Sequence, residues 1–273
     1  MNLMRLLHLD SVLMHTTRGK KIAIFGTSGF AREVFDIAFD VGYREFVFIS
    51  GKKVSDTFSG SFLGYQIIDE AKIPFLVSNG FEFAIGIGDN KIRKRIAQKY
   101  PNLKYVNLLH KTATFGHSQK KLIGEKQGNI IAAGVRITNN VEIGNFCIFN
   151  LNCTIGHDCV IEDFVNVAPG ANISGNVYLS EGAFIGTNAA ILQGKSVEEK
   201  LTIGRFSIVG AGAVVTNNVP HNVIVVGVPA KPLSNNKSSI SKKRSQIEHQ
   251  RHSNTGGGRT RKGFDLHPQS FAA

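Results

Sequence analysis

Apolar residues recur at every sixth position through the middle of the chain. The fifteen positions that share this period are Ile131, Ile137, Ile143, Phe149, Ile155, Ile161, Val167, Ile173, Leu179, Ile185, Ile191, Val197, Ile203, Val209 and Val215. A six-residue period is typical of a parallel β-helix, in which three short strands form one triangular coil. The repeated side chain fills the interior, and about five stacked coils are predicted. The repeat Val197–Thr202 keeps the period but is highly charged, so we expect it to bulge outward as a loop.

Residues 20–110 follow a different pattern, in which short apolar runs alternate with segments of helical spacing. The runs KKIAIF, REFVFIS and FEFAI predict strands, and FAREVFDIAFDVGY predicts a helix. A second helix is predicted after Asp89, whose carboxylate can cap it. Strands that alternate with helices in this way predict a parallel sheet with helices on its faces.

The tight turn Gly26-Thr27-Ser28-Gly29 joins the first predicted strand to the first helix. Small residues let backbone N–H groups approach a phosphate, and the helix N-terminus favours anions. The turn is no P-loop, because no Lys follows its second Gly. It also lacks the G-x-G-x-x-G pattern, and Ser50-Gly51-Lys52 stands where a dinucleotide site has an acidic residue, which argues against NAD. A turn that only packs the helix on the strand remains the alternative.

Cys147, Cys153 and Cys159 are six residues apart, and each lies two residues before an interior aliphatic position. Small residues hold the same place in other repeats, so these side chains are predicted to point inward from three different faces. They therefore cannot converge with His157 on one metal ion in tetrahedral geometry. We expect the cysteines to fill the core, and no metal site.

His157 lies two residues after the interior position Ile155, in a turn between faces, so it is predicted to point outward. Asp158 is its neighbour. A carboxylate bonded to one ring nitrogen fixes the tautomer and makes the other nitrogen a better base. The residues favour a general base here, with an ordinary surface histidine as the alternative.

The net charge of +12 on 273 residues is unevenly distributed. From Ser234 onward eight Lys and Arg face one Glu and one Asp, so this tail carries 8 − 2 = +6. The tail is polar, rich in Gly and Ser and without an apolar period, which predicts disorder. Because no aromatic residues are interleaved with the basic ones, a solvated tail is favoured over a nucleic-acid-binding arm.

No apolar run approaches the roughly 20 residues that span a bilayer. The weakly apolar start of the chain is interrupted by His8 and Asp10, and no small-residue cleavage site follows. Three closely spaced cysteines do not suggest a secreted disulfide framework. We therefore expect a cytoplasmic protein without membrane insertion.

Several motifs in order carry a resemblance to a known family. They are GTSGFAREV, GDNKIRKRI, NLLHKTA, NCTIGHDCVIEDF, APGANISGNV, IGTNAAI, IVGAGAVV and VVGVPAKP, and they cover about residues 20–233. The set resembles the bacterial sugar acyltransferases with a left-handed β-helix. These include the bacillosamine-type nucleotide-amino-sugar N-acetyltransferases and the sialic acid O-acetyltransferases. The resemblance implies acetyl-CoA as donor and a homotrimer with active sites between adjacent β-helices.

The resemblance also implies roles for single residues. His157 matches the catalytic base, Asp158 its acidic partner, and Gly175 the N–H that polarises the thioester carbonyl. Thr187 and Ala211 match backbone positions along the pantetheine. The segment GVPAKP matches the part that closes on the far end of the coenzyme.

The remaining implied roles concern the acceptor sugar. Asn150 matches an acceptor-site asparagine, and Gly26, Thr27, Ser28 and Gly29 would hold the nucleotide diphosphate. Asn166 stands where relatives often have a second histidine. Ser50-Gly51-Lys52 replaces an acidic pair of the bacillosamine-type members, so the acceptor's identity stays open.

The sequence thus predicts a Rossmann-like α/β N-terminal domain and a left-handed parallel β-helix of hexapeptide repeats. The expected divisions are an extension at 1–19, a nucleotide-sugar domain at 20–110, the β-helix at 111–220, a coenzyme-closing segment at 221–233 and the tail at 234–273. The predicted activity is acetyl transfer from acetyl-CoA to a nucleotide-linked sugar for a surface glycan. The alternatives are O-acetylation of sialic acid or another sugar, and a non-catalytic scaffold subunit.

Overall fold

The computed structural model describes residues 19–51 and 61–233. The predictions for residues 1–18, for Lys52 and for the tail 234–273 lie outside these described residues. The described residues all belong to the compact unit that ends at Leu233. No helix within the described ranges is long and apolar enough to cross a membrane.

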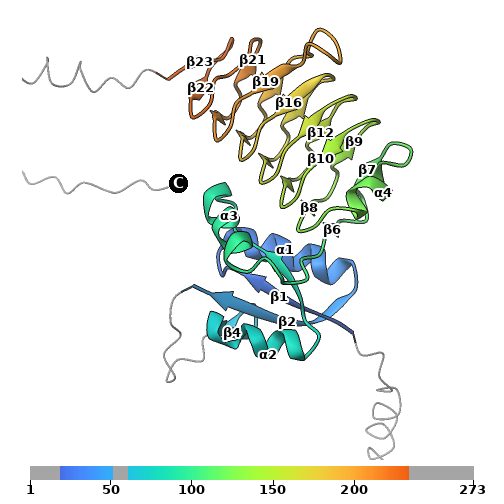
Figure 1. The fold of residues 1–273 in the computed structure, drawn as a ribbon, viewed down its shortest axis with the longest axis vertical. Coiled ribbons are helices and arrows are strands. Elements are labelled where there is room, and N and C mark those ends of the chain that lie inside the picture. The colour runs from blue at the N-terminus through green and yellow to red at the C-terminus, as the bar shows by residue number, and fades with distance from the viewer. Residues whose placement is uncertain (1–18, 52–60, 234–273) are drawn as a thin grey trace, which may run out of the picture. The chain divides into compact units, whose positions relative to one another are not determined.

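The first part of this unit is a five-stranded sheet with strand order β3-β4-β2-β1-β5 (Figure 1). Its parallel strands are β1 (Lys20–Phe25), β2 (Tyr43–Ser50), β4 (Tyr65–Asp69) and β5 (Glu82–Ile85), and β3 (Ser61–Phe62) is antiparallel to β4. The helical segments are α1 (Gly29–Asp40), η2 (Glu70–Lys72), α2 (Ile73–Ser78) and α3 (Asn90–Lys99). The predicted strands and both predicted helices are present, but α1 ends at Asp40 and not at Tyr43, because Gly42 has φ +106° and Tyr43 begins β2. Strands β3 and β4 and helix α2 were not predicted. The parallel pairing follows from the alternation of strands and helices.

The sequence explains why these elements form. Ile22–Phe25 of β1 is buried throughout, as expected for a central parallel strand covered on both faces. Helix α1 buries Ala31, Val34, Ile37 and Ala38, which lie on one side at helical spacing. The predicted cap of α3 is confirmed, because the Asp89 carboxylate accepts from the Ile92 N–H at 2.8 Å.

The second part is a parallel β-helix made of three sheets. The eight-stranded sheet contains β6 (Leu108–Leu109), β8 (Ile130–Ile131), β11 (Ile148–Phe149), β14 (Asn166–Val167), β17 (Phe184–Ile185), β20 (Ile208–Val209), β22 (Ile224–Val226) and β23 (Lys231–Pro232). The six-stranded sheet contains β7 (Thr114–Phe115), β9 (Arg136–Ile137), β12 (Thr154–Ile155), β15 (Asn172–Ile173), β18 (Ala190–Ile191) and β21 (Val214–Val215). The four-stranded sheet contains β10 (Glu142–Ile143), β13 (Val160–Ile161), β16 (Val177–Leu179) and β19 (Leu201–Ile203).

The six-residue period corresponds to the interior of this β-helix. Fourteen of the fifteen repeat positions are buried. Val197 is the exception, with 50% of its surface exposed, because residues 193–200 leave the β-helix between β18 and β19. The prediction that Val197 fills the interior is therefore wrong, whereas the prediction of an outward loop at this repeat is confirmed.

The predicted packing of the cysteines is also confirmed. Cys147, Cys153 and Cys159 are fully buried, and they precede strands of three different sheets. The Cys147 and Cys159 thiols donate to the carbonyls of Glu162 and Ser174. Burial raises the pKa to about 12 for Cys147 and Cys153 and to about 11 for Cys159, so all three stay protonated near neutral pH.

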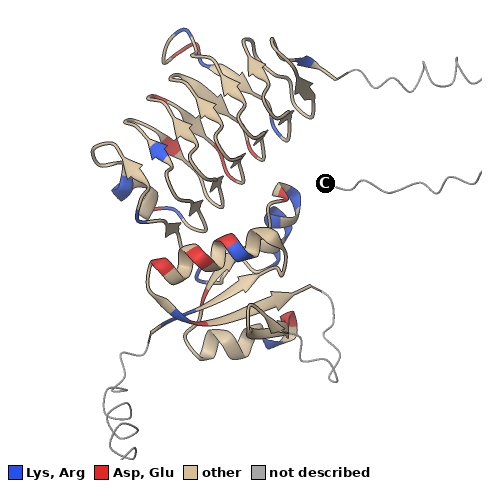
Figure 2. Cartoon of the chain, turned by 180° about the vertical axis from the view of Figure 1, so that it is seen from behind, with Lys and Arg blue, Asp and Glu red and all other residues tan. Residues whose placement is uncertain are grey.

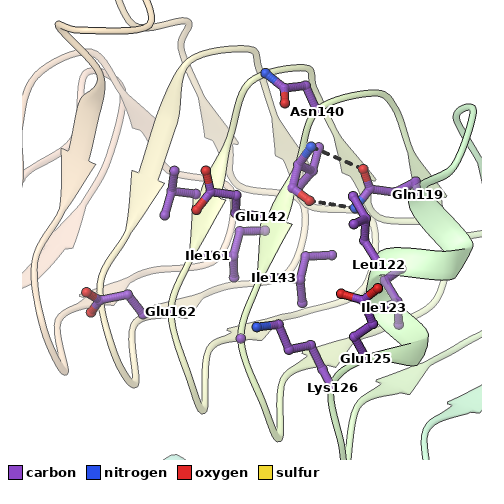
Figure 3. A pocket seen from close by; sticks show the side chains of 13 residues that line it. Gln119, Leu122, Ile123, Glu125, Lys126, Asn140, Glu142, Ile143, Ile161 and Glu162 are labelled. Carbon is purple, nitrogen blue, oxygen red and sulfur yellow. Dashed lines mark hydrogen bonds between the residues drawn. The ribbon is translucent and has the colours of Figure 1, made fainter.

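Helix α4 (Gln119–Gly124) covers the exposed edge of the first strand of the four-stranded sheet. The Gln119 side-chain amide donates to the Val141 carbonyl at 2.5 Å and accepts from its N–H at 3.1 Å. Figure 3 shows this paired contact. One amide side chain thus takes the place of a neighbouring strand, which protects an edge that would otherwise invite pairing with another chain.

Arg93 of α3 connects the two parts of the unit. Its side chain is completely buried, and it donates to the carbonyls of Phe146 and Phe164 at 2.7 and 2.8 Å. Further bonds run to the carbonyls of Ile87 and Gly88 in the loop before α3. Burial lowers the pKa of Arg93 to about 10, so the guanidinium still carries its charge at neutral pH. Figure 2 shows that α1 and α3 carry several charges, whereas most of the β-helix ribbon carries none.

Replacing Arg93 with Met should destabilise the protein. The substitution keeps an aliphatic stem but leaves the buried carbonyls of Phe146 and Phe164 without this donor, and each unsatisfied group costs about 1–3 kcal/mol. We expect the free energy of unfolding, measured in a denaturant titration, to fall by roughly 3 kcal/mol or more. Arg95→Met, on the exposed side of the same helix, is the control and should change little. Equal stability of the two variants would contradict this role of Arg93.

Candidate active site

His157 and Asp158 lie in the turn between β12 and β13. We call this turn, together with the equivalent turn one coil above, the histidine corner (residues 156–159 and 174–176). The His157 Nδ1 atom is 2.6 Å from the Asp158 Oδ2 atom. The imidazole points outward, with 54% of its side chain exposed. The contact that adjacency in sequence only suggested is therefore present in the structure.

Asn140 holds the second oxygen of this carboxylate. Its Nδ2 atom donates to the Asp158 Oδ1 atom at 2.6 Å from eighteen residues earlier, one coil below. The bonds from Asn140 and then His157 hold the pKa of Asp158 below its usual value. Both Asn140 and Asp158 have positive φ, 56° and 58°, a conformation that Asn and Asp tolerate better than most residues. Asn140 was not predicted from the sequence, although the eighteen-residue coil length would have found it.

Gly175 lies one coil above His157. A Cβ atom on Gly175 would be only 2.6 Å from the His157 Cε1 and Nε2 atoms. The next residue, Asn176, donates its N–H to the His157 carbonyl at 2.9 Å. The missing side chain therefore leaves the room that the imidazole occupies.

Thr187 and Ala211 lie at a different corner, between the eight- and six-stranded sheets. We call it the asparagine corner (residues 150–152, 168–170, 186–188 and 210–212). The Gly212 N–H donates to the Thr187 carbonyl at 2.8 Å, so the two coils stack directly. Within one chain these residues do not lie beside His157.

Asn150 is at the lower end of the asparagine corner and contacts α1. Partial burial raises the pKa of Glu33, and a hydrogen bond from Asn150 partly offsets this effect. Water still reaches the Glu33 side chain, because the residue is exposed overall. Glu33 lies four residues after Gly29 on α1. The start of this helix therefore connects Asn150 to the turn Gly26–Gly29, which we call the glycine turn.

The turn Gly26–Gly29 has two unlike glycines. Gly26 has φ +109°, and a Cβ atom there would be 2.9 Å from the Gly86 carbonyl oxygen. Gly29 has no positive φ, and a Cβ atom there would meet nothing within 4 Å. The need for glycine is therefore strict at Gly26, whereas Gly29 can accept a side chain.

Asn166 is buried on the outer face of β14, in the eight-stranded sheet. Its Nδ2 atom donates to the Gly88 carbonyl at 3.1 Å. Asn166 thus contacts the loop before α3, away from the histidine corner of its own chain. Across the described residues, no group of three or more His, Cys, Asp and Glu side chains is arranged to hold a metal ion.

Comparison with known proteins shows which family this chain belongs to. Residues 21–100 match the model of the PglD N-terminal domain. The GDP-perosamine N-acetyltransferase of Escherichia coli O157:H7 is 32% identical over 233 residues, which cover 80% of this chain and 98% of that relative. The chain belongs to the β-helix sugar acyltransferase family.

Solved structures of this family agree. PerB from Caulobacter crescentus, in complex with CoA and GDP-perosamine, is 27% identical with a TM-score of 0.67, covering 78% of this chain and 97% of PerB. The acetyltransferase domain of PglB from Neisseria gonorrhoeae, in complex with acetyl coenzyme A, is 30% identical with a TM-score of 0.66, covering 78% of this chain and 99% of that domain. The predicted fold class, a Rossmann-like domain followed by a β-helix, is confirmed, and so is the predicted acyltransferase class.

Substituting Gly175 by Ala should reduce turnover in this acyltransferase. The new methyl group occupies the space of the His157 ring, so the imidazole must swing away from its present position. General-base catalysis contributes roughly 10²- to 10⁴-fold, so a catalytic role of this imidazole predicts a fall in kcat of at least 10²-fold. Gly124→Ala, where a Cβ atom meets nothing within 4 Å, is the control. Full activity of folded Gly175→Ala would show that the imidazole is not needed in this position.

Proposed function

We propose that this protein transfers the acetyl group of acetyl-CoA to the amine of a nucleotide-linked amino sugar, with His157 as general base. The observation that carries the proposal is the His157–Asp158 pair packed against the bare backbone of Gly175. Similarity along almost the whole length of a GDP-perosamine N-acetyltransferase supports the substrate class. We further propose that the product enters a surface glycan.

The reaction needs few groups. The acceptor nitrogen attacks the thioester carbonyl carbon, and the new N–C bond forms while His157 Nε2 takes the proton. The C–S bond then breaks and CoA leaves as a thiolate. A backbone N–H at Gly175 would stabilise the oxyanion, a contribution of about 10²- to 10³-fold. Because the cysteines are buried and protonated, a direct transfer is favoured over a covalent intermediate.

The two corners support a division of labour between substrates. The glycine turn Gly26–Gly29 would hold the acceptor diphosphate at the start of α1, where backbone N–H groups and the helix dipole favour anions. Asn150, in contact with α1, would face the sugar. Thr187 and Ala211 would line the path of the pantetheine along the asparagine corner.

We further propose a homotrimer, which the separation of these corners supports. His157 and Gly175 lie at one corner, whereas Asn150, Thr187 and Ala211 lie at another. A neighbouring copy would bring its histidine corner to the asparagine corner of this chain and complete the site. We infer a cytoplasmic location, because three free, buried cysteines fit a reducing compartment.

The test is an assay of purified protein with acetyl-CoA against GDP- and UDP-linked amino sugars, free amino sugars and sialic acid, with products identified by mass spectrometry. N-acetylation of a nucleotide-linked amino sugar is the expected result. O-acetylation of sialic acid or a free sugar would replace the proposed acceptor. No transfer to any acceptor would favour the non-catalytic scaffold.

Removing the base should abolish most turnover without unfolding the protein. The imidazole of His157 is outward and contributes nothing to the core, so His157→Ala should keep its melting temperature and lose about 10²- to 10⁴-fold in kcat. Asp158→Asn should lose less, since it perturbs only the tautomer and orientation of the ring. His117→Ala removes another exposed histidine and serves as control. Unchanged kcat in His157→Ala would overturn the assignment of the base.

The glycine turn can be tested separately from the β-helix. A valine at Gly29 enters open space, so the protein should fold, but its side chain blocks the approach of a diphosphate to the backbone. We expect Gly29→Val to raise KM for the nucleotide sugar at least tenfold while KM for acetyl-CoA stays unchanged, the pattern of lost binding to one substrate. An unchanged acceptor KM would show that this turn does not hold the diphosphate.

A further inference from the structure

The loop 193–200 is fixed to the histidine corner at both ends. The Gly194 N–H donates to the Gly175 carbonyl at 3.1 Å, and the Leu201 N–H donates to the Asn176 carbonyl at 3.1 Å. A Cβ atom on Gly194 would be only 2.1 Å from the Asn176 carbonyl oxygen. The loop therefore lies directly on the coil that packs against His157.

Most charges of this loop are satisfied within it. The Lys195 ammonium contacts the Glu199 carboxylate at 2.5 Å, and both side chains are largely exposed. The hydroxyl of Ser196 accepts from the N–H groups of Glu198 and Glu199. Figure 2 shows charged residues on this protruding loop near the far end of the β-helix. These bonds close the loop on itself and pair Lys195 with Glu199, whereas the Glu198 carboxylate accepts from the Ser196 hydroxyl and also lies in the field of Lys200.

Lys200 is directed differently. Its side chain is half-buried, and its ammonium reaches down to donate to the backbone carbonyl of Asp158. The equivalent carbonyl one coil above, that of Asn176, is the one that accepts from Leu201. Lys200 and Leu201 thus donate to the equivalent backbone carbonyls of two successive coils. Lys200 also brings a positive charge to the coil of His157 and Asp158.

We propose that Lys200 is a positioning residue for acetyl transfer, which fixes the backbone at Asp158 and balances the carboxylate charge so that the imidazole of His157 rests as the neutral base. This inference depends on the proposed role of His157. Among the described residues, the charged groups that act on Asp158 are His157 and Lys200, while Asn140 is a neutral donor. Without the ammonium, the carboxylate would act on the imidazole uncompensated and favour its protonated form, which cannot accept a proton.

The direction of the effect follows from charge alone. Removing a cation near an imidazole makes the ring bind its proton more tightly, so a higher pH is needed to obtain the neutral base. A unit charge several ångströms away at a partly exposed site changes such an equilibrium by roughly half to one pH unit. A role limited to holding the loop would instead lower kcat equally at every pH.

The experiment compares Lys200→Met, Lys200→Arg and the control Lys195→Met with the wild type. The signals of the His157 ring are followed by NMR in the free enzyme as the pH is varied, with His157→Ala used to assign them. We expect the midpoint to rise by roughly half a pH unit or more in Lys200→Met, to stay unchanged in Lys195→Met and to return in Lys200→Arg. The acid limb of kcat/KM, with acetyl-CoA and GDP-perosamine, should move in the same direction.

An unchanged midpoint in a folded Lys200→Met protein overturns the inference, as does a loss of kcat that is independent of pH. The two proposals fail separately. If His157→Ala stays active, the role of His157 as base is wrong, whatever Lys200 does. If His157→Ala is inactive and Lys200→Met titrates like the wild type, only the role of Lys200 is wrong.

Discussion

The eighteen-residue coil is the constraint on which the rest of this structure depends. Each coil pairs its strands with the coil below. Up to β18, which precedes loop 193–200, residues eighteen apart lie over one another, as Ile155 does under Ile173. Residues at equivalent corners of successive coils therefore form columns along the β-helix. One column stacks Asn140, Asp158 and Asn176, all in the left-handed conformation. Backbone hydrogen bonds between coils fix this stacking, so no additional side-chain packing is needed to place His157. A single glycine one coil above, Gly175, makes room for its ring.

This regularity decides how much of the site could be predicted from the sequence. The interior positions, the buried cysteines and the outward His157 are all found by counting by six. Lys200 could not be found in this way, because loop 193–200 departs from the period and a long side chain can reach several directions from its backbone. Arg93 was missed for another reason. It occurs in a strongly charged helix, and only tertiary packing makes it the one arginine of α3 that is buried.

Arg93 also explains how the N-terminal sheet and helices are attached to a repetitive β-helix. Its guanidinium is desolvated among carbonyl oxygens, and within the described part of the chain no carboxylate lies among the acceptors of its bonds. Such an arrangement contributes less to net stability than to uniqueness, since a planar fork of donors fits only one placement of its acceptors. The acceptors belong to two β-helix corners, to the loop before α3 and to the first turn of that helix. The fork therefore fixes α3 on the β-helix, and with it the sheet that holds Gly26 and the first turn of α1.

Charge at the histidine corner has to satisfy two opposing needs. The Asp158 carboxylate must be ionised to orient the imidazole, and the bonds from Asn140 and His157 keep it so. An ionised carboxylate at 2.6 Å, however, also stabilises the protonated ring, which is useless as a base at rest and required only after proton transfer. In the role proposed for Lys200, its ammonium offsets the carboxylate charge without competing for the carboxylate oxygens, because it binds the Asp158 carbonyl instead. Under this proposal, short hydrogen bonds orient the imidazole and a longer-range charge balances the carboxylate, so different residues set the two properties.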